Sequence, residues 1–596
     1  MSTTISKKEN LRGGEFMVKS TESGDMFIPE DFNEEQRMVQ QMVIDFIKDA
    51  GDRVYQLEEQ PRLIEEAGEL GLLGAHMPEV YGGMQLDTNT NTLIVEALGA
   101  AGGSFDTSFA AHTGIGMLPI LYFGTDEQKQ KYLPGLTTGE LKAAYCLTEP
   151  GSGSDALAAK TRADLSEDGK HYILNGQKMW ISNAGFADVF IVFAKINGKD
   201  FTGFIVDAHS PGIKLGEEEN KLGIKASSTR QVFFENTLVP VENLLGERGK
   251  GHYIAFNALN IGRFKLGAMA MGGSKLAINL SVQYANERHQ FNQPIAQFGA
   301  IKYKIAEQVA KTFAVESAIY RVSGLLEKAK DSYLEEGASY GDAAVKSAKE
   351  YAPECAIIKV AGSEYLDYVV DELVQILGGY GYSEEYPAAR PYRDARINRI
   401  YEGTNEVNRQ LMVSQILKSG FTGKIDLVGP AWAVQKELME MPSREIPEGE
   451  FGQEEKAIIN LKKILLLVAG AAAKYQMDGK HDLRKEQMIV AGIANIAMDV
   501  FIAESLLLRR LKLEDPSYAY RHGDIVTTIL RLFIYDAQDR IVKEATDCLG
   551  SFAGGDELSI MLKGVRRFSK YPAINVKEAR TSIADMAIEA NGYPLG

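Results

Sequence analysis

The sequence is poor in cysteine and histidine. Its 596 residues include three cysteines, Cys146, Cys355 and Cys548, which lie far apart and show no paired spacing. Neither a disulfide framework nor a zinc site is therefore expected, and a reducing compartment, here the cytoplasm, is predicted. The eight histidines form no HxxxH or HExxH pattern, so no metal ion is expected.

Long apolar runs are also missing, and so is the pattern of a targeting segment. The longest apolar run, residues 464–473, is much shorter than the roughly 20 residues that an α-helix needs to cross a bilayer. No transmembrane segment is therefore predicted. Residues 1–26 mix acidic and basic side chains and contain no apolar core of a signal peptide. This segment is predicted to be a disordered lead-in.

Basic residues are outnumbered. The chain has 65 lysines and arginines against 81 aspartates and glutamates, which gives a net charge of -16. Sequence-independent binding to nucleic acid depends on clustered positive charge, so no nucleic-acid partner is expected. A few local cations can still hold the phosphates of a small ligand on an acidic protein. The chain is too long for one core, and three to four domains are expected.

The pattern of apolar residues divides the chain after the lead-in into four blocks. Asn33 and Gln36 form a helix-capping signal, and apolar residues at helical spacing follow them. Short apolar runs separated by turn residues then indicate strands. Helical spacing returns near residue 254 and resumes after a predicted linker formed by Gly429-Pro430 and residues 441–450. The predicted blocks are helical 27–142, β-rich 143–253, helical 254–428 and C-terminal helical 429–596.

Three short segments carry the chemistry. Residues 145–155 are YCLTEPGSGSD, residues 178–185 are KMWISNAG, and residues 400–405 are IYEGTN. The last segment follows an arginine-rich stretch and places a glutamate between an aromatic residue and a glycine. No GxGxxG segment opens a helix after a strand, so a nicotinamide cofactor is not expected.

Together, in this order and at these separations, the segments resemble the acyl-CoA dehydrogenase family, flavoenzymes that desaturate acyl thioesters between Cα and Cβ. The additional C-terminal block resembles the long form of the family, typified by very-long-chain acyl-CoA dehydrogenase. The resemblance implies a mainly α fold with a central β domain, an α–β–α arrangement plus an additional C-terminal helical domain. It also implies FAD-dependent dehydrogenation of acyl-CoA in fatty-acid β-oxidation, with electrons passed to an electron-transfer flavoprotein.

Glu402 is the candidate catalytic base. The α-proton of a thioester is weakly acidic, so the site must polarise the carbonyl, supply a desolvated carboxylate and present a hydride acceptor at Cβ. An apolar acyl chain beside Glu402 would raise the pKa of its carboxyl group. The resemblance implies that Glu402 removes the α-proton while hydride moves to flavin N5. Some relatives carry the base just before a helix arginine, but that position here is Gly262, which has no carboxylate.

The resemblance also assigns residues to the substrate and the cofactor. It implies that acyl-CoA contacts Ser154, Asn260, Arg263, Tyr401 and Gly403. For FAD it implies that the hydroxyl groups of Thr148 and Ser182 contact the flavin ring and that Trp180 covers the ring. It also implies that Arg288 forms two hydrogen bonds with the pyrophosphate and that Phe291 lies near the adenine. Further contacts with the dinucleotide are implied for Gln375 and Gly379, in a loop of a neighbouring subunit, and for Thr404 and Asn405. A cofactor that bridges subunits requires a homo-oligomer, expected to be a dimer.

Two alternatives stay open. An acyl-CoA oxidase would pass the electrons to oxygen, and no residue named above excludes that acceptor. A flavin-loaded assembly or scaffold protein would keep the fold with only vestigial activity. The intact Glu402 favours catalysis.

The role of the C-terminal block and the length of the acyl chain are also open. Leu461, Ile464, Leu465 and Val468 form an apolar stripe that must be buried. A structural role is favoured, because Glu454 and Glu455 dilute the positive charge that an interfacial helix needs; peripheral contact with a membrane is the alternative. Residues 112–116 contain two glycines, which could widen the wall of a site for a long acyl chain.

Overall fold

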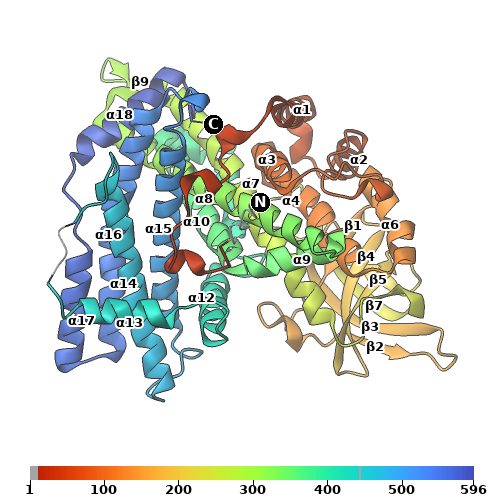
Figure 1. Ribbon diagram of the computed structural model, residues 1–596. Helices are drawn as coiled ribbons and strands as arrows, with labels where there is room; N and C mark the ends of the chain where they lie inside the picture. Colours follow the sequence, from red (N-terminus) through yellow and green to blue (C-terminus); the bar gives the residue numbers. More distant parts are fainter. Residues whose placement is uncertain (1–10, 442–444, 596) are drawn as a thin grey trace, which may run out of the picture.

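The chain folds as helices, one β-sheet, more helices and a C-terminal helical bundle. Figure 1 shows this order in a computed structural model that describes residues 11–441 and 445–595. The predicted fold class is confirmed. Predictions for residues 1–10 of the lead-in, residues 442–444 of the linker and residue 596 lie outside the described residues.

Six helices precede the sheet. The first begins where the sequence predicts, because the Asn33 side chain accepts a hydrogen bond from the Gln36 N–H (2.9 Å) and the Gln36 side chain accepts one from the Asn33 N–H (3.1 Å). Val43 and Phe46 on this helix are buried. The helices are α1 (Glu34–Ala50), α2 (Gln60–Glu69), α3 (Thr88–Leu98), α4 (Gly103–Ala110), α5 (Leu118–Phe123) and α6 (Asp126–Thr138).

Eight strands form the sheet, in the order β6-β7-β3-β2-β4-β5-β8, with β1 paired in parallel to β4. β4 and β5 are buried along most of their length, whereas β3 and β7 alternate between buried and more exposed residues. Each apolar run predicted to be a strand lies in one of these four. The strands are β1 (Ala143–Cys146), β2 (Arg162–Leu165), β3 (His171–Ser182), β4 (Val189–Ile196), β5 (Asp200–Asp207), β6 (Ile213–Leu215), β7 (Thr229–Pro240) and β8 (Leu244–Leu245).

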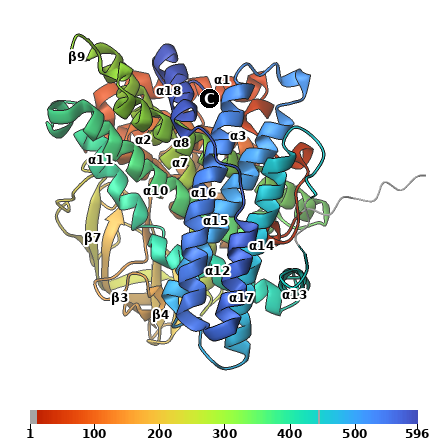
Figure 2. The same cartoon turned by 90° about the vertical axis from the view of Figure 1, so that its left-hand side faces the viewer.

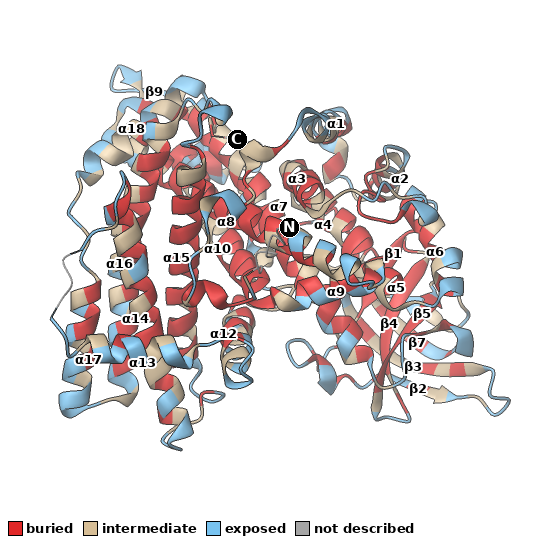
Figure 3. Cartoon of the chain, viewed as in Figure 1, coloured by how far each residue is buried: buried red, intermediate tan, exposed pale blue. Residues whose placement is uncertain are grey.

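Long helices form the centre of the molecule, and Figure 3 shows them largely buried. α10 packs along α7, and the two backbones approach closely at a glycine pair. A Cβ added to Gly267 would lie 2.4 Å from Cγ2 of Ile358, and one added to Gly362 would lie 3.0 Å from Cα of Gly267. The elements are α7 (Gly251–Glu287), β9 (His289–Gln290), β10 (Gln293–Pro294), α8 (Gly299–Glu335), α9 (Tyr340–Glu350), α10 (Ala352–Leu377), α11 (Ala389–Ala395) and α12 (Asn405–Phe421).

The C-terminal block is a helical bundle that packs against α8 and α12, as Figure 2 shows from its outer side. The stripe predicted on its first long helix is buried. The linker prediction is wrong at its start, because Gly429 and Pro430 lie in the first turn of a helix, where proline is tolerated since its missing N–H has no helical partner. The helices are α13 (Val428–Glu437), α14 (Gly452–Met477), α15 (Gln487–Lys512), α16 (Gly523–Phe552), α17 (Gly555–Phe568) and α18 (Val576–Ala590).

Part of the predicted disordered lead-in is ordered, which corrects the sequence-based expectation. A short 3-10 helix spans Glu15–Met17, and Phe16 and Met17 are buried against α14 and α15. The N–H of Gly14 donates to a Glu354 carboxylate oxygen (2.7 Å) on α10. Contacts with distant elements hold this segment in place. Its own sequence has no apolar periodicity, so the ordered structure could not be predicted from the sequence pattern.

One helix among the described residues is long and apolar enough to cross a membrane. It is α15, and 89% of its most apolar stretch is buried inside the fold.

Candidate active site

A left-handed turn presents Glu402. After α11 the chain passes through a 3-10 helix, Arg396–Arg399, and reaches α12 at Asn405. Glu402 and Gly403 both have positive φ, 56° and 81°, a conformation that glycine adopts readily and that is strained for glutamate. Thr404 caps α12, because its Oγ1 accepts a hydrogen bond from the Val407 N–H (3.3 Å). The turn therefore reverses the chain and points Glu402 toward α7.

The Glu402 carboxyl group rests against Gly262. A Cβ at position 262 would lie 2.6 Å from Oε2 of Glu402, so only glycine leaves room for the carboxyl group there. Oε2 is buried and has no hydrogen-bond partner among the described residues. Burial raises the pKa of Glu402 to about 7, although Arg263 and Lys359 act to lower it. Such a carboxyl group is available to exchange a proton near neutral pH.

Arg263 and Asn260 lie beneath this turn. The Arg263 Nε donates to the backbone oxygen of Glu402 (3.2 Å), and its Nη1 donates to Oδ1 of Asn260 (2.7 Å). Both residues are buried. The resemblance places them at the CoA moiety, whereas their contacts here hold the backbone of Glu402. The sequence does not distinguish a contact with CoA from a contact with the backbone of Glu402. The reason is that α7 is buried on most sides and has no polar face that would reveal its orientation.

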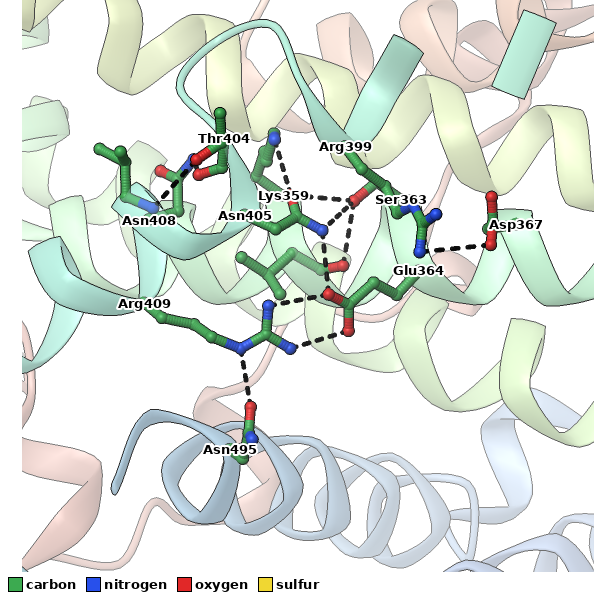
Figure 4. A network of polar contacts seen from close by, with 12 residues as sticks. Lys359, Ser363, Glu364, Asp367, Arg399, Thr404, Asn405, Asn408, Arg409 and Asn495 are labelled. Atoms are coloured by element: carbon green, nitrogen blue, oxygen red, sulfur yellow. Dashed lines mark hydrogen bonds and ion pairs between the residues drawn. The ribbon is translucent and has the colours of Figure 1, made fainter. Parts of the chain in front are cut away.

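A network between α10 and α12 holds the turn from the other side (Figure 4). Nζ of Lys359 donates to the Gly403 oxygen and to Oδ1 of Asn405, both at 2.7 Å. Nδ2 of Asn405 donates to Ser363 (3.1 Å) and to Glu364 (3.0 Å). The Asn405 side chain is thus buried and bonded inside the protein, and its contact with the dinucleotide stays a prediction. Its place in the first turn of α12 gave no sign of this burial.

Lys359 belongs to the site but is not among the residues predicted from the sequence. It is fully buried, and burial lowers its pKa to about 7. The available signal is its place in the apolar run 356–361, because a lysine inside such a run of a helix needs a partner or a function.

Glu402 opens into a cavity, here called the Glu402 cavity, with about 1100 Å³ of empty space, part of it continuous with solvent. Tyr401 and Ser182 line it, so the structure brings these predicted residues together with Glu402. One wall is the α7 face with Leu266 and Met269, and the opposite wall includes Gly114, where an added Cβ would meet no atom within 4 Å. That glycine does widen the cavity. Small and apolar side chains dominate the lining around the carboxyl group.

Trp180 stands exposed beside the Glu402 cavity. A β-bulge between Lys178 and Ile181 gives Trp180 a positive φ of 60° and leaves it 54% exposed. The backbone oxygen of Thr148 accepts a hydrogen bond from the Met179 N–H (2.9 Å), so Thr148, Trp180 and Ser182 lie on adjoining segments. A large exposed aromatic side chain on a strained backbone, with hydroxyl groups on either side, fits the ring of a flavin.

A buried ion pair joins the first two sequence motifs. Nζ of Lys178 donates to Oε1 of Glu149 (2.7 Å), and both side chains are buried. Ser154 lies beyond Glu149 on the exposed turn of the first motif. The ion pair therefore fixes the segment of Thr148 and Ser154 against the strand of Trp180, a structural role that the sequence analysis did not identify.

The remaining predicted cofactor residues form a second, exposed group. The Arg288 guanidinium lies over the Tyr380 ring (5.7 Å), next to Gln375 and Gly379 at the C-terminal end of α10. Phe291, beside β9, is 88% exposed. Figure 1 shows β9 and β3 at opposite ends of the molecule. Within one chain, β9 beside Arg288 and Phe291 is thus far from β3, which carries Trp180.

Comparisons with known proteins agree with one another. Family models match in four places: "Acyl-CoA dehydrogenase, N-terminal domain" over residues 33–140, "middle domain" over 144–237, and two models described as "C-terminal domain" over 249–417 and 460–567. The chain is 45% identical over 590 residues to a probable acyl-CoA dehydrogenase of Bacillus subtilis (strain 168), which covers 98% of each protein.

Two further relatives support the same family. The mitochondrial very long-chain specific acyl-CoA dehydrogenase of Homo sapiens is 41% identical over 356 residues, 58% of this chain and 52% of that protein. The crystal structure of an acyl-CoA dehydrogenase complexed with FAD from Bacillus anthracis superposes with a TM-score of 0.94. It is 45% identical and the match covers 98% of this chain and 100% of that one.

Proposed function

Because the chain belongs to the acyl-CoA dehydrogenase family and is an FAD-dependent oxidoreductase, we propose that it dehydrogenates acyl-CoA thioesters between Cα and Cβ in fatty-acid β-oxidation. The observation that carries the proposal is Glu402. Its carboxyl group is buried, has no hydrogen-bond partner at Oε2 within residues 11–441 and 445–595, and has a pKa of about 7, inside a cavity lined largely by apolar side chains. These are the properties of a general base that works near neutral pH.

Glu402 and the residues that surround it have different roles in the proposed reaction. Glu402 takes the α-proton at its unpartnered oxygen, and Gly262 keeps the space in which that oxygen sits. Arg263 donates to the backbone oxygen of Glu402 and Lys359 to that of Gly403, so the orientation of Glu402 is fixed before substrate binds. The apolar wall excludes water once an acyl chain fills the cavity, which keeps the carboxylate basic.

Thr148, Trp180 and Ser182 would hold the flavin ring. Ser182 lines the Glu402 cavity, so the ring would meet the same space as the acyl chain. FAD, when bound, supplies the acceptor for the hydride that leaves Cβ. Trp180 would shield the bound ring from water, and the hydroxyl groups of Thr148 and Ser182 would hold it by hydrogen bonds.

Spectroscopy tests this function and its rivals. Anaerobic addition of acyl-CoA to the purified yellow protein is expected to bleach the flavin. Reoxidation by an electron-transfer flavoprotein, the proposed partner, should be much faster than reoxidation by oxygen. Faster reoxidation by oxygen would identify an oxidase. No bleaching with saturated acyl-CoA from short to very long chains would favour a scaffold protein.

The rate of flavin reduction should follow the ionisation of Glu402. The carboxylate is the active form, so kcat/KM is expected to rise with pH and level off above about 7. Lys359 lowers the pKa of Glu402, so Lys359→Met should raise that pKa and move the rise to higher pH by about one unit. Ser363→Ala is the matched control, because it loosens Asn405 without removing a charge. An unchanged pH profile in Lys359→Met would contradict the assignment.

The exposed Arg288 group supports a dimer. Arg288 and Phe291 flank β9, which Figure 1 shows at the opposite end of the molecule from β3, the strand of Trp180, so we propose that they bind the FAD of a second copy together with Gln375 and Gly379. A cytoplasmic location is also proposed, and the three buried free cysteines support it.

Arg288→Ala is expected to weaken FAD retention about 10- to 100-fold, because it removes a charge-assisted contact with the pyrophosphate. The FAD content after gel filtration measures this loss. Arg566→Ala, an exposed arginine on α17, is the control and should keep its FAD. A stable monomer that retains stoichiometric FAD in sedimentation would contradict binding across an interface.

A further inference from the structure

Lys265, on α7, is a buried lysine without a counter-ion. Lys265 is only 6% exposed, and its ammonium group has no hydrogen-bond or ion-pair partner in the described part of the chain. The other buried lysines of that part do have partners. Lys178 pairs with Glu149 (2.7 Å), Lys330 pairs with Glu327 (2.9 Å), and Lys462 pairs with Glu504. An unpaired buried ammonium group is costly, so Lys265 requires an explanation.

Lys265 borders a second cavity, here called the Lys265 cavity, which has about 650 Å³ of empty space between α3, α5, α7, α8 and α9. Its lining contains no aspartate or glutamate among the described residues. It does contain hydrogen-bond donors. Nε2 of His76 is buried without a partner, and burial together with Lys265 and Lys330 lowers the pKa of this imidazole, so it stays neutral. Burial raises the pKa of Tyr122, so its hydroxyl also stays protonated. The Lys265 cavity therefore favours an anionic group.

Lys265 also lines the Glu402 cavity, so its side chain stands between the two spaces. It follows Gly262, the residue against which the Glu402 carboxyl group rests, by three positions. Three residues of an α-helix rise about 4.5 Å, so Lys265 lies less than one turn beyond the reacting end of the substrate. An acyl group that starts at Glu402 would bring its far end near Lys265 only if it is short or of medium length.

Besides Glu402, two acidic side chains line the Glu402 cavity, and neither opposes a carboxylate at this wall. Asp106 and Asp394 come from α4 and α11, whereas Lys265 comes from α7. Burial raises the pKa of Asp106 to about 8, so it is largely neutral at pH 7. Asp394 accepts a hydrogen bond from the Ile224 N–H and lies near Arg390 and Arg393, which balance its charge.

We propose that Lys265 is the counter-ion for a carboxylate at the far end of the acyl group, so that the enzyme accepts CoA monothioesters of short or medium-length dicarboxylic acids. The proposal rests on the proposed function. A terminal carboxylate would neutralise the buried ammonium group and take hydrogen bonds from the donors of the Lys265 cavity. A terminal methyl group would leave that charge unpaired.

The test compares two substrates of equal chain length, a dicarboxylic acid monothioester and an ordinary acyl-CoA, over a series of lengths. The readout is the ratio of their kcat/KM values for flavin reduction. Lys265→Met, close to lysine in size, is expected to lower this ratio about 10- to 100-fold at the preferred length, and Lys265→Arg should retain most of it. Lys330→Met is the matched control, because Lys330 already pairs with Glu327 and should change the ratio much less.

A second measurement does not depend on turnover. Lys265→Met removes an unpaired buried charge, so its unfolding temperature should rise, and the unfolding temperature of the wild type should rise on adding a dicarboxylic monothioester. An equal ratio in wild type and Lys265→Met overturns the proposal. A Lys265-dependent shift with free adipate, without any change of the ratio, would assign the site to a free carboxylate and also overturn it. Failure of both the ordinary acyl-CoA and the dicarboxylic monothioester to bleach the flavin at every length would instead overturn the proposed function.

Discussion

Glu402→Gln is expected to abolish reduction of the bound FAD by acyl-CoA, with a loss of at least about 100- to 10,000-fold, the contribution of a positioned general base. Glutamine has the same shape as glutamate but cannot accept the α-proton. The contact between Arg263 and this residue uses the backbone oxygen, so it survives the substitution. The variant should therefore keep the turn, the FAD and the binding of acyl-CoA. Anaerobic stopped-flow absorbance measures the rate of bleaching.

Glu406→Gln is the matched control for this result. Glu406 lies four residues further along, exposed in the first turn of α12, and does not line the Glu402 cavity. Its variant should bleach at the rate of the wild type. If Glu402→Gln bleaches at that rate too, another residue is the base, and the buried position of Glu402 needs a different explanation.

The sequence predicted the position of Glu402 but not its support. The motif at residues 400–405 gave the residue, and the missing carboxylate at Gly262 removed the alternative base. The structure adds why Gly262 matters, since any side chain there would collide with Glu402. Lys359 and Asn405 are 46 residues apart in the sequence and act through contacts between α10 and α12. No local pattern encodes such a pair.

The fold shows the same division between local and tertiary information. The cap at Asn33 and the apolar runs of the strands are local signals, and each leads to the observed element. The ordered residues 11–26 and the helical Gly429-Pro430 depend on distant partners instead. Their local composition is typical of irregular segments, so the sequence pattern alone favours the wrong state.

Ending the chain at Leu427, before α13, is expected to give an aggregating or unstable protein. The cut removes α15, whose buried face packs on α8 and α12, and exposes their apolar side chains. The cut also leaves buried charged side chains without their ion-pair partners. Arg321 would lose Glu504 (2.9 Å), and Glu316 would lose Arg509 (2.6 Å). Breaking one buried ion pair costs about 3–5 kcal/mol, which is a large part of the stability of a domain.

A point variant separates the two causes. Glu504→Gln in the full chain breaks the pairs with Arg321 and Lys462 but keeps every apolar contact of α15, so it should lower stability while the protein stays soluble. Thermal unfolding and light scattering of the two proteins measure the difference. Aggregation in the truncated chain alone would show that apolar cover is the main contribution of the bundle. The truncated chain could instead stay soluble, dimeric and active and lose only its binding to anionic liposomes. That result would support contact with a membrane, because the apolar stripe at Leu461 would then be dispensable for folding.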